Sequence, residues 1–484
     1  MENILNAIFV VMHLHQDYQS SGAVSLQRLL VSFLCLVGQY LTKNNFQSKY
    51  ATRKKSNTVW IYGCFVVPII LSKSTLNTNP DVLQLSTSLG LLTIFIHNLI
   101  SCVSFKLKCL ICSLIMFDQI VRSDSLTLIT SYTDVYIIYA YLVIILHLEA
   151  GTSLSTGEIS VLSQLITYMF NFDMYNRNNT TQATFNYISF SSCISSVMIT
   201  LLLPFIGLCY ITGCRYRNVM FYSHLIGVVT FINYNHARIF SLFYFVLNFF
   251  IFDLLRLQLL VYWLFICFLC VIYTVFHSKS NNRISTAGRK FYHAFILLVF
   301  IPGLVYDVLL LYVSSAIGVC VFILLCVMDA YRLEPFGKRL HFMLIPFKGQ
   351  QDTGKFTLTP VFLFVGLSMP IWLSLSSGND RTIASLQCYS GVLSVGIGDA
   401  FASIAGSKWG KNKFPGTSKT VEGFFASVCS QVLSLYMLVY FDCVAFNMSQ
   451  LYITVVITLT SLIEVYTKEI DNLILPIIMY SLLI

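Results

Sequence analysis

The chain has 484 residues, of which 56% are hydrophobic and 11% are charged, and its formal net charge is +9. Soluble domains carry roughly 45–50% apolar and about 25% charged residues, so this composition excludes a soluble globular protein. It predicts an all-α, polytopic integral membrane protein with roughly a dozen or more transmembrane helices, because each crossing needs ~20 apolar residues with internally satisfied backbone groups.

Residues 1–328 are interpreted as an N-terminal multi-span membrane region. Expected spans in it are 24–42, 58–72, 83–105, 126–147, 188–211, 219–232, 239–252, 259–276, 291–307 and 308–327. No basic segment precedes the first apolar run, which argues against a cleaved signal peptide. Asn178 and Asn179 lie in overlapping N-glycosylation sequons and Asn447 in another, and the sequence leaves their use open.

Cysteines and basic residues differ in how they are distributed. The 15 cysteines are scattered, many within apolar runs, which indicates buried small hydrophobes rather than a disulfide framework or a zinc site. Lysine and arginine gather in four loops at 43–55, 279–290, 332–355 and 408–419. The positive-inside rule makes these loops cytosolic candidates, and solvation beside anionic headgroups explains the first two adequately.

Residues 329–484 form a second region with a different character. A long amphiphilic loop at 329–355 carries Arg332 and a turn that contains Asp352, and spans are expected at 356–376, 386–397, 424–441 and 451–462. Two spans separate the basic loops at 332–355 and 408–419, so both can lie on the same side of the membrane.

Residues 398–423, GDAFASIAGSKWGKNKFPGTSKTVEG, are a polar, basic and glycine-rich segment in an otherwise apolar sequence. Asp399 is expected where an apolar helix meets the loop, a position where a carboxylate is costly unless a cation or metal compensates it. Thr420 is the expected N-cap of the next helix, whose free amides would face the ligand that the lysines attract. The pattern predicts a phosphate site; the alternative is an ordinary basic juxtamembrane loop.

A second cluster follows in IEVYTKEIDNLILP. Asp471 and Asn472 come seven and eight residues after Glu464, which predicts that all three lie near one helical face. Phosphoryl transfer from a nucleotide requires a divalent ion and a carboxylate that orients or deprotonates the attacking hydroxyl. These carboxylates could serve both purposes, or they could simply cap and solubilise a helix end.

The two segments carry a recognisable pattern. Asp399, Ala402, Gly406 and Gly410, followed by PGTSKTVEG, resemble the CTP-binding signature of the CTP-dependent polyprenol and lipid kinases, and EVYTKEIDNLILP resembles the segment that accompanies it. RLEPFGKRL, QQDTGK and GLSMPIWL are more similar to the dolichol kinases than to the phytol or diacylglycerol kinases. Ser418 is a departure, since the family usually has a lysine there, and Lys419 would then contact phosphate alone.

The resemblance implies transfer of the γ-phosphate of CTP to the terminal hydroxyl of dolichol, which supplies the lipid carrier of protein N-glycosylation. It places the enzyme in the endoplasmic reticulum membrane with a cytosolic site. It implies a divalent cation, Mg²⁺ or Ca²⁺, and no nucleic-acid partner; protein partners stay unspecified. The implied residues are Asp399, Asp471 and Lys419 for catalysis; Gly406, Gly410, Gly416, Thr417, Lys419, Thr420, Glu422 and Gly423 for CTP; Asp399 and Glu422 for the metal; and Glu464, Asn472, Arg332 and Asp352 as accessory groups.

Other functions are compatible with parts of the sequence. Within enzymes these are a CTP-dependent kinase of another lipid alcohol and a cytidylyltransferase, which would release pyrophosphate rather than CDP. A transporter or channel would also explain the spans and the basic loops. It would require charged residues in mid-span, and these are scarce in the sequence.

Overall fold

The computed structural model describes residues 139–176, 214–234, 244–279, 286–345, 348–349, 352–376, 384–444, 448–467 and 469–484, with several shorter pieces between 194 and 212. In these ranges the regular structure is helical, apart from one isolated antiparallel bridge between Lys413 and Thr420. The all-α prediction is therefore confirmed for the described part of the chain. Predictions that lie outside the described residues are the spans at 24–42, 58–72 and 83–105 and the sequons at Asn178, Asn179 and Asn447.

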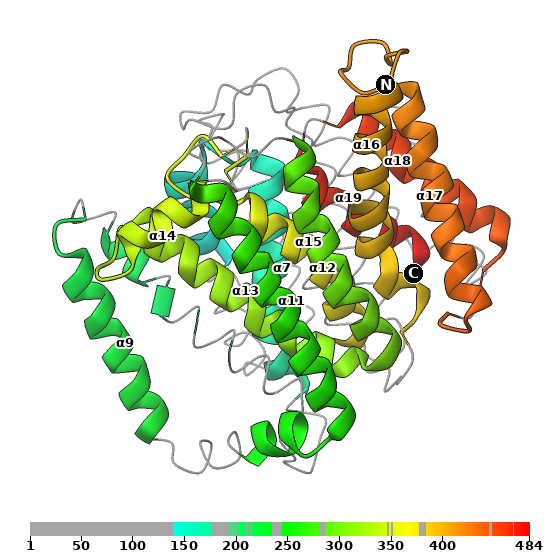
Figure 1. Cartoon of the computed structure of the whole chain (residues 1–484). Helices are drawn as coiled ribbons and strands as arrows, with labels where there is room; N and C mark the ends of the chain where they lie inside the picture. Colours follow the sequence, from blue (N-terminus) through cyan, green and yellow to red (C-terminus); the bar gives the residue numbers. More distant parts are fainter. Residues whose placement is uncertain are drawn as a thin grey trace, which may run out of the picture.

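Most of the described helices belong to one bundle (Figure 1). In chain order they are α7 (Thr156–Asn176), α9 (Arg217–Tyr234), the π-helix η2 (Leu247–Ile251), α11 (Leu254–Lys279), α12 (Thr286–Tyr306), α13 (Val308–Ala330), α14 (Gly337–Leu344), α15 (Thr359–Ser376), the 3₁₀-helix η4 (Leu386–Tyr389), the π-helix η5 (Val392–Asp399), α16 (Ala400–Trp409), α17 (Val421–Tyr440), α18 (Gln450–Tyr466) and α19 (Asp471–Leu483).

Four of the described helices are long and apolar enough to cross a membrane, namely Leu254–Phe276, Val308–Ala330, Leu386–Trp409 and Val421–Tyr440. Large apolar side chains such as Phe268 on α11 and Leu433 on α17 are exposed, as expected for helices that face lipid. The chain is a multi-pass membrane protein. The predicted total of a dozen or more spans goes beyond what the described residues can test.

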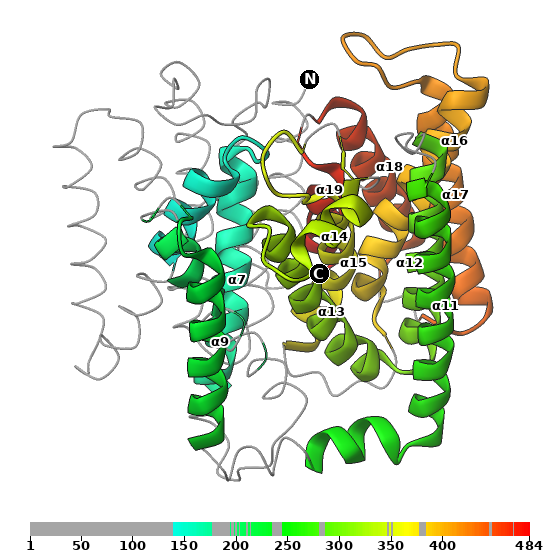
Figure 2. The same ribbon diagram turned by 60° about the vertical axis from the view of Figure 1, so that its left-hand side comes forward.

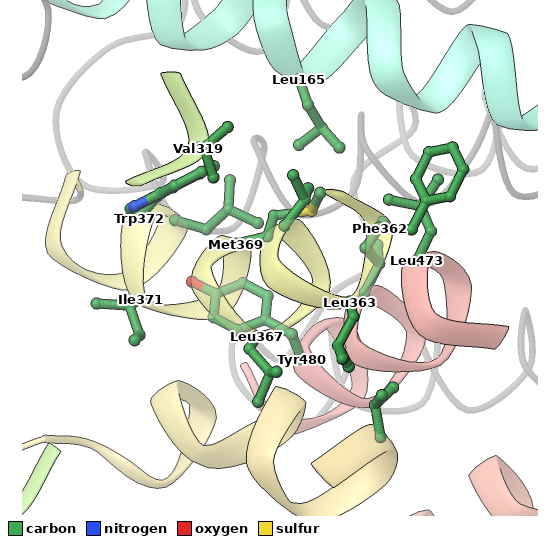
Figure 3. Packing of buried hydrophobic residues seen from close by; sticks show 14 of the residues in the cluster. Leu165, Val319, Phe362, Leu363, Leu367, Met369, Ile371, Trp372, Leu473 and Tyr480 are labelled. Atoms are coloured by element: carbon green, nitrogen blue, oxygen red, sulfur yellow. The ribbon is translucent and has the colours of Figure 1, made fainter. Parts of the chain in front are cut away.

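Helix α15 lies at the centre of the core (Figure 3). Leu367 and Ile371 of α15 are fully buried, and Val319 of α13, Leu165 of α7 and Tyr480 of α19 pack around the same helix. α15 is apolar along its whole length, without a polar stripe, which is the pattern of a helix surrounded by protein on every side. The core therefore brings helices from distant parts of the sequence against a single central element.

The start of α19 is packed closely against α15. A Cβ atom on Gly366 would lie 1.8 Å from the carbonyl oxygen of Asn472, a distance that no side chain tolerates. Glycine at this position lets the two backbones touch. The first turn of α19, which contains Asp471 and Asn472, is thereby fixed relative to the core.

Helices α16 and α17 form an antiparallel pair at one edge of the bundle, with α18 beside α17 (Figures 1 and 2). The loop between them, residues 410–420, projects beyond the helix ends in both views. The helix that begins in η5 continues without a break to Trp409. The expectation that the helix would end at Asp399 is therefore wrong, because no residue between 399 and 409 interrupts the backbone hydrogen bonding.

Candidate active site

The loop between α16 and α17 is a short hairpin. The Val421 amide donates to the Asn412 carbonyl at 2.8 Å, and the Phe414 amide donates to the Lys419 carbonyl at 3.1 Å. Its turn contains Gly416, whose φ of +75° lies in the left-handed region that other residues rarely adopt. The hairpin therefore holds the segment that leads into α17 in one place.

Thr420 is the N-cap of α17, as predicted, and its Oγ1 accepts a hydrogen bond from the Gly423 amide at 3.2 Å. A Cβ on Gly406 would lie 2.8 Å from Thr420 Oγ1, one on Gly410 would lie 2.6 Å from Thr420 Cγ2, and one on Gly423 would lie 2.8 Å from the Ala402 carbonyl. These three glycines thus allow α16 and α17 to approach each other closely. The prediction that Gly406, Gly410 and Gly416 let the backbone approach a ligand stays a prediction, and Gly406 and Gly423 also line the cavity described next.

A cavity of about 380 Å³ lies between α16, α17, α18 and the hairpin. Its lining includes Asp399, Lys419, Thr420, Gly423 and Glu464. This volume is at the lower end of the range for small-molecule sites. The N-terminus of α17 contributes its positive dipole end to the same cavity, so the structure brings together a cation, helix amides and two carboxylates.

Each of the two cavity carboxylates is paired with a lysine. Lys419 Nζ lies 3.0 Å from Glu464 Oε1, and Lys290 Nζ donates to Asp399 Oδ2. The Asp399 and Glu464 side chains are only 10% and 5% exposed. Removing a carboxylate from water is costly unless a cation or a metal compensates, and here a lysine fulfils that requirement for each.

Lys290 and His293, at the start of α12, are site residues that sequence reasoning missed. Lys290 pairs with Asp399 across 109 positions of sequence, and His293 Nδ1 lies 4.0 Å from the same carboxylate oxygen. In the sequence, Lys290 belongs to a basic loop that solvation explains, and His293 stands isolated. The available signal is their spacing of three residues at the start of an apolar helix, which places them on one face.

Asp471 and Asn472 begin α19; neither lines the cavity, but the Asp471 carboxylate interacts electrostatically with Lys419 and Asp399. Asp471 Oδ1 accepts the Asn472 amide at 2.9 Å, and the Asn472 side-chain oxygen is buried without a hydrogen-bond partner among the described residues. An unpaired buried acceptor needs an explanation, and a ligand hydroxyl or water would satisfy it. The prediction that these residues share a helical face with Glu464 is wrong, because α18 ends at Tyr466 and a turn separates it from α19.

The charges of the site are unequal. Three carboxylates (Asp399, Glu464 and Asp471) face two lysines (Lys290 and Lys419). Burial by itself would lower the pKa of Lys419, but the carboxylates of Glu464, Asp471 and Asp399 outweigh it and raise the pKa well above its usual range. Lys419 is therefore a permanent cation at physiological pH.

The Asp399 carboxylate in the cavity lining is a donor of the kind that divalent cations prefer. Among the described residues, no group of three or more histidine, cysteine, aspartate or glutamate side chains could hold a metal alone. Mg²⁺ is commonly bound by one or two carboxylates together with substrate phosphates, so a single carboxylate in a phosphate cavity suffices. Asp399 meets that description.

Several of the residues predicted from sequence lie apart from the cavity lining. Glu422 accepts hydrogen bonds from the Asn412 amide at 3.1 and 3.3 Å and thus ties the hairpin to α17. Asp352 is buried and accepts the Leu358 amide at 3.2 Å and the Thr359 hydroxyl at 2.7 Å.

Arg332 donates to Asp329 at 2.9 Å. Thr417 is also absent from the lining; its hydroxyl accepts the Lys419 amide at 3.3 Å within the hairpin. Of the predicted site residues, the structure therefore brings together in the cavity lining Asp399, Gly406, Lys419, Thr420, Gly423 and Glu464. It leaves the assignment of Glu422 to a metal as a prediction without geometric support.

Comparisons of the chain with known proteins all point to the same family. A family model described as "Dolichol kinase" matches residues 89–362, which include Lys290 but end before the hairpin. The chain is 35% identical over 240 residues to "Dolichol kinase" from Homo sapiens, covering 47% of this chain and 45% of that protein.

Similarity extends to plants and fungi. "Dolichol kinase EVAN" from Arabidopsis thaliana is 33% identical over 234 residues, covering 47% of this chain and 40% of the relative. The dolichol kinase of Schizosaccharomyces pombe is 31% identical over 243 residues, covering 48% of this chain and 47% of the relative. The matches thus span about half the length of these relatives or less. No solved structure matches the chain.

Proposed function

This chain belongs to the dolichol kinase family, and on that premise we propose that it transfers the γ-phosphoryl group of CTP to the terminal hydroxyl of dolichol. The observation that carries the proposal is the cavity in which Lys419 and the N-terminus of α17 face Asp399, within the helix Leu386–Trp409, and Glu464, near the end of α18. A cavity of this kind combines an anion site with carboxylates, as phosphoryl transfer requires.

The triphosphate would be held by Lys419 and the first amides of α17. Lys419 is protonated and its side chain is 41% exposed, so it can exchange Glu464 for a phosphate oxygen without a conformational change of the backbone. Ammonium–phosphate contacts are charge-assisted and stronger than neutral hydrogen bonds. In the absence of nucleotide, Glu464 keeps this lysine in place.

Asp399 would hold the divalent cation, Mg²⁺ or Ca²⁺, together with the phosphates of CTP. When bound, the cation neutralises charge on the phosphates and so favours departure of CDP. Lys290 pairs with Asp399 before the nucleotide arrives, and its ammonium would become available to a phosphate once the carboxylate turned to the metal.

Asp471 would accept the proton of the dolichol hydroxyl, and the Asn472 amide oxygen would orient that hydroxyl. The hydroxyl oxygen forms a bond to the γ-phosphorus, the bond from that phosphorus to the β,γ-bridging oxygen breaks, and CDP leaves. Asp399 and Asp471 could exchange these two roles. The unpaired Asn472 oxygen, next to Asp471 in the chain, supports Asp471 as the proton acceptor.

The membrane helices give the lipid substrate its place. A polyisoprenoid stays in the bilayer, so only its hydroxyl end has to reach a site at the membrane surface. Such a site lies where α16 and α17 end in the basic hairpin (Figure 1). We place it on the cytosolic side of the endoplasmic reticulum membrane, because basic loops favour that side and CTP is cytosolic.

The deciding experiment supplies the purified protein in detergent or nanodiscs with CTP labelled at its γ-phosphate, together with dolichol, phytol or diacylglycerol. We expect label in dolichol and release of CDP. Label in phytol or diacylglycerol alone would assign a different lipid alcohol. Release of pyrophosphate would indicate a cytidylyltransferase, and absence of transfer to every lipid would refute a kinase.

A further inference from the structure

Residues 149–158, which we call the connector, join the apolar helix Tyr139–Ala150 to α7. Ser155 and Glu158 form a reciprocal capping box at the start of α7. Ser155 Oγ accepts the Glu158 amide at 3.2 Å, and Glu158 Oε2 accepts the Ser155 amide at 2.8 Å. A capping box of this kind satisfies two amides that a helix N-terminus leaves free.

Both side chains also reach another part of the chain. Glu158 Oε1 accepts the Ile470 amide at 2.6 Å across 312 positions of sequence, and Ser155 Oγ donates to Glu469 Oε2. Ser155 and Glu158 are fully buried. The capping box therefore holds the turn that precedes α19, and it does so in a region that water does not reach.

This contact is more than a helix cap requires. One carboxylate oxygen of Glu158 completes the capping box, while the other is used for Ile470. Ile470 is the N-cap of α19, and the next residue is Asp471. A carboxylate that accepts a backbone amide makes a charge-assisted bond, and in a buried position its loss leaves both groups unsatisfied.

The two ends of α19 are held by separate contacts. At its C-terminal end, Gln387 Nε2 donates to the Leu483 carbonyl at 2.8 Å, and the Tyr452 hydroxyl donates to the Leu482 carbonyl at 2.9 Å. Loss of the Glu158 bond would consequently leave α19 packed in the bundle, but its first turn would keep only the contact of Asn472 with Gly366 and would gain freedom to move. The Asp471 carboxylate would then lose its defined position relative to Lys419.

We propose that Glu158 is a positioning residue for phosphoryl transfer: through the Ile470 amide it fixes the Asp471 carboxylate against the nucleotide cavity, with Ser155 and Glu469 as its support. This inference rests on the function proposed above. It assigns a role to a segment in which the sequence indicated no chemistry. The connector acts on the acceptor hydroxyl and leaves the CTP-binding hairpin, which other contacts hold, unaffected.

The test compares Glu158→Gln and Ser155→Ala with Ser449→Ala. Ser449 caps α18 in the same way, accepting the Tyr452 amide at 3.3 Å, but it lies at the helix end opposite the cavity. A glutamine at 158 keeps the size of the side chain, but it can accept only one of the two amides. Ser155→Ala removes the hydroxyl and disturbs the packing less, so it covers the case in which the buried Glu158→Gln variant does not fold.

Two readouts are needed. Hydrogen exchange of the Ile470 amide, measured by mass spectrometry on the peptide that contains it, reports the bond without any turnover. Steady-state kinetics separates kcat from the KM for CTP. For Glu158→Gln we expect faster exchange at Ile470, a fall in kcat of about tenfold or more, and a KM for CTP within about twofold. Ser155→Ala should change the exchange at Ile470 and kcat in the same directions but by less, and Ser449→Ala should change neither the exchange nor kcat.

Faster exchange at Ile470 with an unchanged kcat would overturn the positioning role, and unchanged exchange would show that the bond is absent. A parallel rise in the KM for CTP would show a general loss of structure instead, which also contradicts the proposal. Wild-type protein that transfers no phosphate, while Glu158→Gln still loosens Ile470, would refute the proposed kinase function and leave the bond confirmed.

Discussion

Replacing Lys419 with methionine separates two roles that the structure gives this residue. Its ammonium lies 3.0 Å from Glu464 Oε1, and the Glu464 side chain is only 5% exposed. Methionine keeps much of the aliphatic volume but removes the charge. The variant therefore loses a phosphate contact and, at the same time, leaves a carboxylate without its cation.

The magnitudes differ for the two roles. A hydrogen bond to a charged group contributes about 1.5–3 kcal/mol, which corresponds to a loss of about 10–150-fold in apparent affinity for CTP. Breaking a fully buried ion pair costs about 3–5 kcal/mol. Because the Lys419 side chain is 41% exposed, solvent screening reduces that penalty, and we expect a loss of about 1–2 kcal/mol in stability.

The double variant Lys419→Met/Glu464→Gln distinguishes the roles, since it removes the unpaired carboxylate. Thermal unfolding in detergent should show a lower Tm for Lys419→Met and recovery toward the wild type in the double variant. The KM for CTP, measured by transfer of labelled γ-phosphate, should stay high in both. A wild-type KM in either variant would refute the phosphate contact and leave Lys419 a purely structural partner of Glu464.

Three further predictions follow from the same contacts. Lys290→Met should lower kcat/KM by about tenfold or more, because the buried Asp399 loses its cation, and Lys290→Arg should retain more activity. Equal kcat/KM in the wild type and both variants would contradict a role for α12 in the site. Asp399→Asn should raise the concentration of Mg²⁺ or Ca²⁺ needed for half-maximal transfer, whereas Glu422→Gln should not, because Glu422 binds Asn412 instead. A higher metal requirement in Glu422→Gln, with none in Asp399→Asn, would identify Glu422 as the ligand. The pKa of Lys419 is raised above the unfolded value of about 10.4, so its stabilising contribution is fully present below that pH and is lost only as pH rises through the folded pKa. The KM for CTP should therefore show no rise from Lys419 between about pH 7 and pH 9, and a rise there that Lys419→Arg abolishes would show that burial lowers the pKa of this lysine instead.

Local features of the site were predictable from sequence because they depend on nearby residues. Thr420 as the N-cap of α17 follows from its side chain and from the apolar run after it, and the structure confirms it. The basic hairpin and the cavity position of Lys419 follow from composition. The spacing of Glu464 and Asp471 misled, because Thr467 adopts an extended backbone that ends α18 and places the two residues on different helices.

Long-range contacts could not be predicted in this way. Lys290 lies 109 positions from Asp399, and Glu158 lies 312 positions from Ile470. Periodicity and capping signals report only on a few turns of helix, so they cannot indicate which helix ends meet. The glycines illustrate the same limit: Gly406 is predicted as a ligand-binding position and does line the cavity, but its packing against Thr420 could not be predicted from sequence.

The capping box at Ser155 and Glu158 has an evolutionary consequence. The sequence predicts a boundary at residue 328, yet each side of it supplies a contact that the other side needs. A fragment that starts at 329 would keep Asp399, Lys419 and Asp471 but would lack both Lys290 and the acceptor for Ile470. The site therefore requires both regions in one folded protein, and separate expression of residues 329–484 should give no active enzyme.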